Sequence, residues 1–310
     1  MAKPESAFAA ETNFMSNLVL TSVYGLSAEK VEPFLYSLRH CGCTDDLVVF
    51  ANQISPECRA MLLRYQARLV EFESFGSQLA YAGLAERLAS IPRAAYRAYV
   101  QHRRDVRCLI INCWRFFGFF EYLNQLRNKP DYVLLSDIRD VVFQANPFVF
   151  SPGLSVASEC VRGTIRSSPG NSKWLWEAAG FLELIKLGKC TPVCAGTTAA
   201  DYPSMIKYLA FMTEQLRKRY FWGLFDGVDQ GLHNYLVYNR LVQPLHLQTN
   251  WNGPFLTLDS ETVSPKNKTK DGYLCNEDGS VIPIVHQYDR IKDLFQKGES
   301  RPPCWKFYTS

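Results

Sequence analysis

The chain has 310 residues, of which 47% are hydrophobic and 21% are charged, as in globular proteins with a buried core and unlike disordered chains. Its net charge of +4, from 34 basic and 30 acidic residues, permits anionic substrates but does not indicate a nucleic-acid-binding protein. The 10 cysteines include no paired CxxC motifs, so we expect no structural zinc site and mostly buried, reduced thiols.

The N-terminal part of the chain alternates between predicted strands and helices. Continuous apolar runs predict the strands, and apolar residues at helical spacing predict the helices between them. The expected strands are 17–25, 46–51 and 68–72, and the expected helices are 29–41 and 56–65. This alternation predicts a parallel sheet that helices cover on both faces.

Helices dominate the predicted elements further along the chain. We expect helices at 78–90, 93–101, 105–126, 172–187, 202–220 and 229–238, and strands within 153–160 and 190–198. The expected organisation is an N-terminal tail (1–16), a single domain (17–295) and a C-terminal tail (296–310). Because no signal peptide or membrane span is predicted, we expect a cytoplasmic protein, with a peripheral membrane contact left open.

Two acids follow the apolar run 132–135, which predicts a buried strand. Asp137 and Asp140 lie three residues apart at its end, with Arg139 between them. Ligands of open α/β sheets gather outside the carboxyl ends of strands, and hard divalent cations prefer carboxylate oxygens. One interpretation is a site for a divalent cation and the phosphates it carries. The other is that one of the two is a turn acid and the other is paired with Arg139.

Two later segments carry further candidate residues. Asp229 and Gln230 begin a predicted helix, where an acid can act as a general base or only cap the helix. His286 ends the short apolar strand 284–286, and Arg290 follows on a turn. By itself, a lone histidine on an apolar strand is more often a structural residue than a ligand.

The segment 136–144, Ser-Asp-Ile-Arg-Asp-Val-Val-Phe-Gln, resembles the signature of nucleotide-sugar-dependent glycosyltransferases of the GT-A fold, in a subgroup with Ser-Asp-x-Arg-Asp-Val-x-Phe-Gln. Relative to the family's Asp-x-Asp motif, Asp140 takes the second acidic place, Ile138 takes the first, and Asp137 stands one residue early. The resemblance covers about residues 17–290. It implies a GT-A, Rossmann-like α/β fold, with a mixed, mostly parallel sheet and helices on both faces.

The resemblance also implies a function. It is metal-dependent transfer of a hexose or pentose from a nucleotide-diphosphate sugar to a hydroxyl of a glycan, polysaccharide or lipid-linked sugar, as in polysaccharide biosynthesis. Asp140, Asp137 and His286 would hold Mn²⁺ or Mg²⁺, and Asp229 and Gln230 would be catalytic. The residues that would contact the nucleotide and donor are Thr21, Ser22, Tyr24, Arg115, Asp137, Arg139, Gly196, Thr197 and Arg290.

Two other functions remain open. A nucleotidyltransferase shares nucleotide and metal binding, but it normally has a glycine-rich, basic loop after the first strand. Residues 21–26 contain a single glycine and no lysine or arginine. The second alternative is a non-catalytic sugar- or nucleotide-binding protein of the same fold.

The resemblance leaves open whether the transfer retains or inverts the anomeric configuration of the sugar. The Asp229–Gln230 pair resembles some retaining families, whereas an inverting enzyme would use Asp229 as its base. The anomer of the product distinguishes the two.

Overall fold

The computed structural model describes the greater part of the predicted domain. The described residues are 17–72, 106–159, 163–219, 227–258, 268–290 and 303–306. The helices predicted at 78–90 and 93–101 and the predicted N-terminal tail lie outside these ranges.

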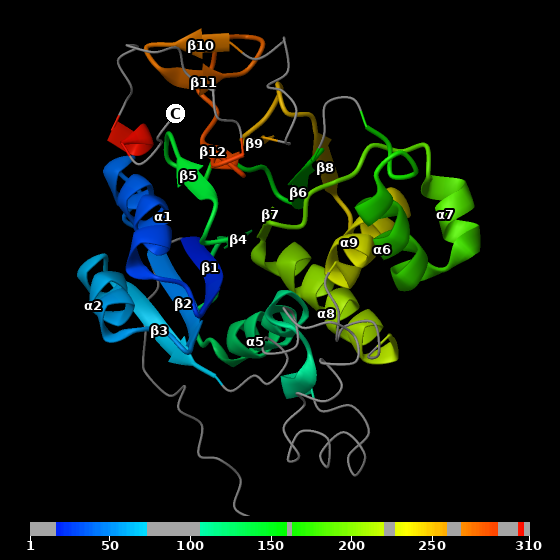
Figure 1. Cartoon of the computed structure of the whole chain (residues 1–310), viewed down its shortest axis with the longest axis horizontal. Helices are drawn as coiled ribbons and strands as arrows, with labels where there is room; N and C mark the ends of the chain where they lie inside the picture. Colours follow the sequence, from blue (N-terminus) through cyan, green and yellow to red (C-terminus); the bar gives the residue numbers. More distant parts are fainter. Residues whose placement is uncertain are drawn as a thin grey trace, which may run out of the picture.

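The centre of the molecule is a seven-stranded sheet (Figure 1). In order across the sheet, its strands are β3 (Ala67–Glu71), β2 (Asp46–Asn52), β1 (Asn17–Tyr24), β4 (Tyr132–Ser136), β7 (Thr197–Asp201), β6 (Leu154–Ala157) and β8 (Leu245–Gln248). β7 runs antiparallel to β4 and β6, and the other neighbouring pairs are parallel. The carboxyl ends of β1, β2, β4 and β6 therefore meet at one edge, where such sheets bind ligands.

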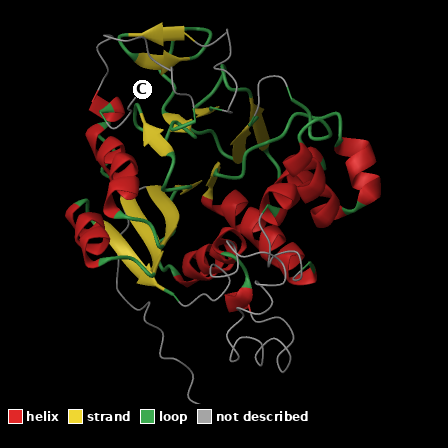
Figure 2. Cartoon of the chain, viewed as in Figure 1, coloured by secondary structure: helices red, strands yellow, loops and turns green. Residues whose placement is uncertain are grey.

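Helices cover both faces of this sheet (Figure 2). The helices of the described residues are α1 (Ala28–His40), α2 (Pro56–Arg64), α5 (Ile111–Gln125), α6 (Pro169–Ala179), α7 (Phe181–Leu187), α8 (Tyr202–Lys218) and α9 (Val228–Tyr238). Side chains alternate along β1. Leu18 and Leu20 pack in one core with α5, α8 and α9, and Val19 packs in the other with α1 and α2. This mixed, mostly parallel α/β sheet with helices on both faces is the expected fold class.

A smaller sheet continues from the carboxyl end of β4. Its strands, in order, are β5 (Val141–Phe143), β12 (Ile284–His286) and β9 (Phe255–Thr257), and a separate hairpin joins β10 (Lys268–Lys270) to β11 (Tyr273–Cys275). Only residues 137–140 separate β4 from β5. β12 pairs antiparallel with β5, so that His286 lies opposite Val141. This pairing brings His286 next to Asp140 although the two are distant in sequence.

The bounds of three predicted elements are wrong. The helix expected at 105–126 is a short 3₁₀ helix (Val106–Cys108) followed by α5. The helix expected at 172–187 is divided into α6 and α7 because Gly180, with φ of 91°, adopts a left-handed conformation that interrupts a helix. The strand expected within 190–198 begins later, as β7.

Residues 303–306, which fall in the predicted C-terminal tail, pack against the domain. Trp305 is 1% exposed, and its Nε1–H donates to Oε1 of Gln144 at 3.0 Å. The side-chain amide of Gln144 also donates to the carbonyls of Leu274 (2.9 Å) and Ile282 (2.7 Å). Gln144, the last residue of the signature segment, thus joins β5 and β11 to the C-terminal segment.

The described cysteines are all free thiols, and most of them are buried. Across the ranges given above, no helix is both long enough and apolar enough to cross a membrane.

Candidate metal centre

Three side chains converge where β4 ends. Asp137 and Asp140 lie in the turn between β4 and β5, and His286 ends β12. The Nε2 atom of His286 is 3.5 Å from Oδ2 of Asp137 and 3.5 Å from Oδ1 of Asp140. One ligand atom of each residue lies within 4.8 Å of the other two. Two carboxylate oxygens and an imidazole nitrogen form a donor set that suits a divalent cation such as Mn²⁺.

The turn between β4 and β5 directs both acids toward His286. Ile138, which stands where the family motif has its first acid, is 2% exposed and packs in the core with α1. Because Ile138 points into that core, Asp137 supplies a carboxylate to the cluster from one position earlier in the chain. The side chain of Asp137 is 32% exposed, whereas that of Asp140 is 7% exposed. Asp140 is therefore the more enclosed of the two acids.

Gly196 leaves open the space that Asp137 and His286 occupy. Its carbonyl accepts a hydrogen bond from the backbone N–H of Asp137 at 2.8 Å. A Cβ atom at position 196 would lie 2.5 Å from Cε1 of His286 and 2.6 Å from Oδ2 of Asp137. These distances are far shorter than ordinary van der Waals contacts. A residue without a side chain is required at this position because the two candidate ligands pass close to its backbone.

Cys194 contacts the opposite side of the His286 ring. Its Sγ atom lies 3.2 Å from Nδ1 of His286 and accepts a hydrogen bond from the backbone N–H of Gly196 at 3.3 Å. A partner at Nδ1 orients the ring and leaves Nε2 facing the carboxylates. The sequence offers no signal for this contact, because Cys194 and His286 are 92 positions apart and the thiol resembles the other buried cysteines.

Arg115 of α5 joins Asp137 to Asp229. Its guanidinium pairs with Oδ1 of Asp137 and lies 3.6 Å from Oδ2 of Asp229. The side chain of Arg115 is only 10% exposed. Burial alone would raise the pKa of Asp137, but the charge of Arg115 and the contact with His286 hold that pKa below its ordinary value. Asp137 is therefore ionised at neutral pH and tied to the acid at the start of α9.

The charges of the cluster balance one another. Nη2 of Arg139 donates to Oδ2 of Asp140 at 2.9 Å, so the ion pair anticipated from the sequence is present beside the cluster. Burial would raise the pKa of Asp140, but His286 and Arg139 hold it well below its ordinary value. Burial would lower the pKa of His286, but Cys194, Asp137 and Asp140 hold it well above that value. A cation bound at Nε2 would replace the imidazolium proton, since a histidine ligand must be neutral.

Gln230 ties the start of α9 to the turn before β7. Its Oε1 accepts from the N–H of Ala195 at 2.9 Å, and its Nε2 donates to Oε2 of Glu159 at 2.9 Å. Asn171 of α6 donates to the same oxygen of Glu159 at 3.2 Å. Asp229 precedes Gln230 and is 5% exposed.

Glu159, which follows β6 at the carboxyl edge of the sheet, was not predicted as a site residue. An acid directly after the apolar run of that strand is the signal that could have identified it.

The remaining predicted site residues lie on neighbouring strands or beyond them. Thr21, Ser22 and Tyr24 lie in the carboxyl-terminal half of β1, which pairs with β4. Thr21 is fully buried, whereas Ser22 and Tyr24 are partly exposed. Thr197 is the buried first residue of β7. Arg290 is exposed on the turn after β12.

Comparisons with known proteins find similarity to solved structures but none to sequence families or curated proteins. The sequence matches no protein-family profile and no curated protein. Among solved structures, the chain is similar to core-mannan synthase A (CmsA/Ktr4) from Aspergillus fumigatus in its Mn/GDP form. The identity is 10%, the TM-score is 0.43, and the similarity covers 80% of this chain and 79% of that chain. We therefore assign the site from this chain's own residues.

Substitution of Gly196 by alanine is expected to weaken metal binding. The added methyl group must displace either His286 or Asp137, and misplaced ligands typically lose about 10- to 100-fold in metal affinity. Calorimetric titration of Mn²⁺ into the purified variant measures the loss. Gly42→Ala is the control: its Cβ meets nothing within 4 Å, although its φ of +83° is strained for alanine, so it should cost stability without affecting Mn²⁺. Equal Mn²⁺ affinity in Gly196→Ala and wild type would contradict the placement of the cation.

Proposed function

We propose that the chain is a metal-dependent glycosyltransferase that moves a sugar from a nucleotide-diphosphate sugar to a hydroxyl acceptor. The observation that carries this proposal is the convergence of Asp137, Asp140 and His286 at the carboxyl edge of the sheet. The first two belong to the segment that resembles the glycosyltransferase signature, and the third comes from a distant strand. A cation held there would stabilise the negative charge that develops on the departing nucleoside diphosphate.

The residues of the cluster and its neighbours would bind the metal and the diphosphate. Asp140, with His286 and Asp137, would hold Mn²⁺ or Mg²⁺. Arg139, whose side chain is 46% exposed and oriented by Asp140, would contact a diphosphate oxygen, because guanidinium groups pair well with phosphates. Arg115 would keep Asp137 ionised and in position.

Asp229 would act on the acceptor side. In the transfer, the bond between the anomeric carbon and the diphosphate oxygen breaks, the acceptor oxygen bonds to that carbon, and the acceptor hydroxyl loses its proton. Asp229, which lies beside the cationic Arg115, would accept that proton or hold sugar hydroxyls. Gln230, bonded at both ends of its amide, would keep the start of α9 fixed against the turn before β7.

Thermal unfolding with Mn²⁺ and a panel of nucleotide sugars tests the proposal. A donor present at one hundred times its dissociation constant should add about 2.7 kcal/mol to the free energy of unfolding. We expect this stabilisation to require both the metal and the diphosphate, because the cation bridges protein and phosphate. If no nucleotide sugar stabilises the Mn²⁺-loaded protein, the proposed donor site is wrong.

Product analysis separates the proposal from its two alternatives. A glycosyltransferase releases nucleoside diphosphate from the bound donor in a metal-dependent reaction. A nucleotidyltransferase would instead release pyrophosphate from a nucleoside triphosphate and a sugar phosphate. A non-catalytic binding protein would show the thermal stabilisation without release of either product.

A further inference from the structure

The surface formed by α6 and α7 exposes an unusual number of large apolar side chains. Phe181 is 62% exposed, Leu182 80%, Ile185 50% and Trp176 48%. Three of them belong to α7, which lies at the outer edge of the molecule, on the opposite side from α1 and α2 (Figure 1). Burial of such side chains is favourable by about 25 cal/mol per Å², so a cluster of them on an outer helix indicates a contact with something outside the chain.

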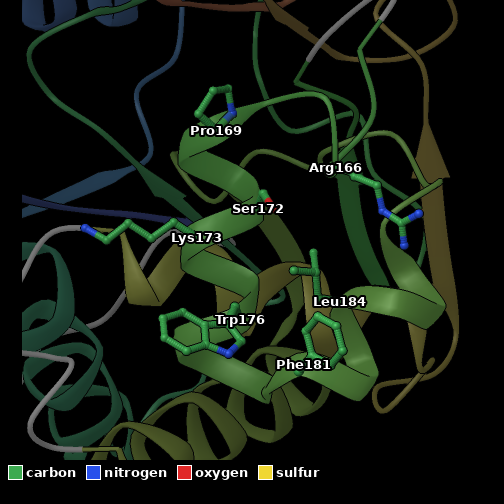
Figure 3. Close-up of a pocket in the computed structure, with 7 residues that line it drawn as sticks. All are labelled: Arg166, Pro169, Ser172, Lys173, Trp176, Phe181 and Leu184. Atoms are coloured by element: carbon green, nitrogen blue, oxygen red, sulfur yellow. The ribbon is translucent and has the colours of Figure 1, made fainter.

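A hollow of about 370 Å³ lies on the same surface, between α6 and α7 (Figure 3). Its apolar wall is formed by Trp176, Phe181 and Leu184, and two cationic side chains, Arg166 and Lys173, also line it. None of the candidate metal ligands lines this hollow. The hollow therefore combines an apolar wall with positive charge at a place separate from the metal cluster.

The charge of this surface is positive. Residues 163–190 contain four basic side chains, Arg166, Lys173, Lys186 and Lys189, all exposed, and two acidic ones, Glu177 and Glu183. Glu177 lies 3.7 Å from Lys173 and Glu183 lies 3.5 Å from Lys186, so these pairs offset each other, and Arg166 and Lys189 give the surface its net positive charge. A partner that matches this surface would carry negative charge beside an apolar region.

We propose that the α6–α7 surface docks the protein on a membrane leaflet that contains anionic phospholipids. An anionic headgroup fits beside Arg166 and Lys173, and the protruding side chains of Phe181 and Leu182 enter the apolar layer below it. An acidic protein segment would satisfy the two cations but would leave the outermost apolar side chains in water. This inference goes beyond the proposed function and does not depend on it.

The position of α6 gives such docking a consequence for the candidate site. On one side of the helix, Asn171 bonds to Glu159 and receives a hydrogen bond from Gln230. On the other side, Ser172, Lys173 and Trp176 line the hollow. Helix α6 thus contacts both the polar network beside Asp229 and the proposed membrane-docking surface. A phospholipid bound in the hollow would therefore contact the same helix that borders the candidate active site.

Co-sedimentation with vesicles tests the proposal directly. We expect the full chain to pellet with vesicles of phosphatidylcholine and phosphatidylglycerol and to remain in solution with phosphatidylcholine alone. Arg166→Gln with Lys173→Gln should weaken the binding roughly 25-fold, because each basic side chain near an anionic leaflet contributes about fivefold. Phe181→Ser with Leu182→Ser should weaken it by about tenfold or more, because apolar area is no longer buried.

Matched controls come from exposed residues on other helices. Leu63→Ser on α2 removes a leucine that is 56% exposed, and Lys207→Gln on α8 removes an exposed lysine. Both controls should bind vesicles as wild type does, and melting curves should confirm that every variant is folded. The proposal is overturned if wild type does not bind anionic vesicles, or if the controls lose as much vesicle binding as the α6–α7 variants. Self-association of wild type without vesicle binding, lost in Phe181→Ser with Leu182→Ser, would assign the surface to a second copy of the chain instead.

Discussion

Asp140→Asn is expected to lower the affinity for Mn²⁺ by at least about a hundredfold and to abolish metal-dependent release of nucleoside diphosphate. Loss of a residue that only orients a ligand already costs about 10- to 100-fold, and Asp140 is itself a candidate ligand. It is the more enclosed of the two acids, with a side chain 7% exposed. Calorimetry measures the affinity, and release of nucleoside diphosphate measures the activity.

The same substitution at two other acids gives Mn²⁺ affinities with which that of Asp140→Asn can be compared. Asp137→Asn should cost less, since the carboxylate of Asp137 is 32% exposed and shares its charge with Arg115. Asp271→Asn is the matched control, because Asp271 lies in an exposed surface turn before β11. Equal Mn²⁺ affinity in wild type and Asp140→Asn would refute the metal centre, whatever the activity. Lost activity with retained metal binding would instead place Asp140 in donor binding.

The fold and the position of Asp140 at the carboxyl edge of the sheet could be predicted from the sequence because both depend on local patterns. Apolar runs such as 132–135 are fully buried on a parallel sheet, and that burial leaves a clear signal in the chain. A polar break directly after such a run falls at the carboxyl edge by geometry alone. This pattern places Asp137 and Asp140 at that edge without reference to any contact between distant segments.

The rest of the site depends on contacts between distant segments, which no local pattern carries. The sequence cannot show that Cys194 contacts His286, or that Arg115 reaches both Asp137 and Asp229. The α6–α7 surface was missed for a similar reason. The sequence predicts a single helix at 172–187 and so does not show the break at Gly180 that separates α6 from α7.

Arg115→Met is expected to destabilise the protein by about 3 kcal/mol or more at neutral pH, measured by urea unfolding in EDTA. Removing one partner of a buried ion pair leaves an uncompensated buried charge, which typically costs about 3–5 kcal/mol. Here two acids lose a cationic partner, because Arg115 lies between Asp137 and Asp229. Arg64→Met is the control. Arg64 is 63% exposed in its pair with Glu32, and exposed pairs contribute about 1 kcal/mol or less.

The pH dependence of Arg115→Met separates lost charge pairing from lost packing. In wild type, the pKa of Asp137 is held below 3.8, so its contribution to stability is present above that pH and is lost as the pH falls through the lowered pKa. Without Arg115, the pKa of Asp137 loses the largest influence that lowers it, so folded Arg115→Met takes up a proton at a higher pH than folded wild type does. The deficit of Arg115→Met relative to wild type should therefore shrink as the pH falls from neutral through the pKa that Asp137 has in the variant. A deficit that stays constant over this range would mean that the methylene groups of Arg115, and not its charge, stabilise the site.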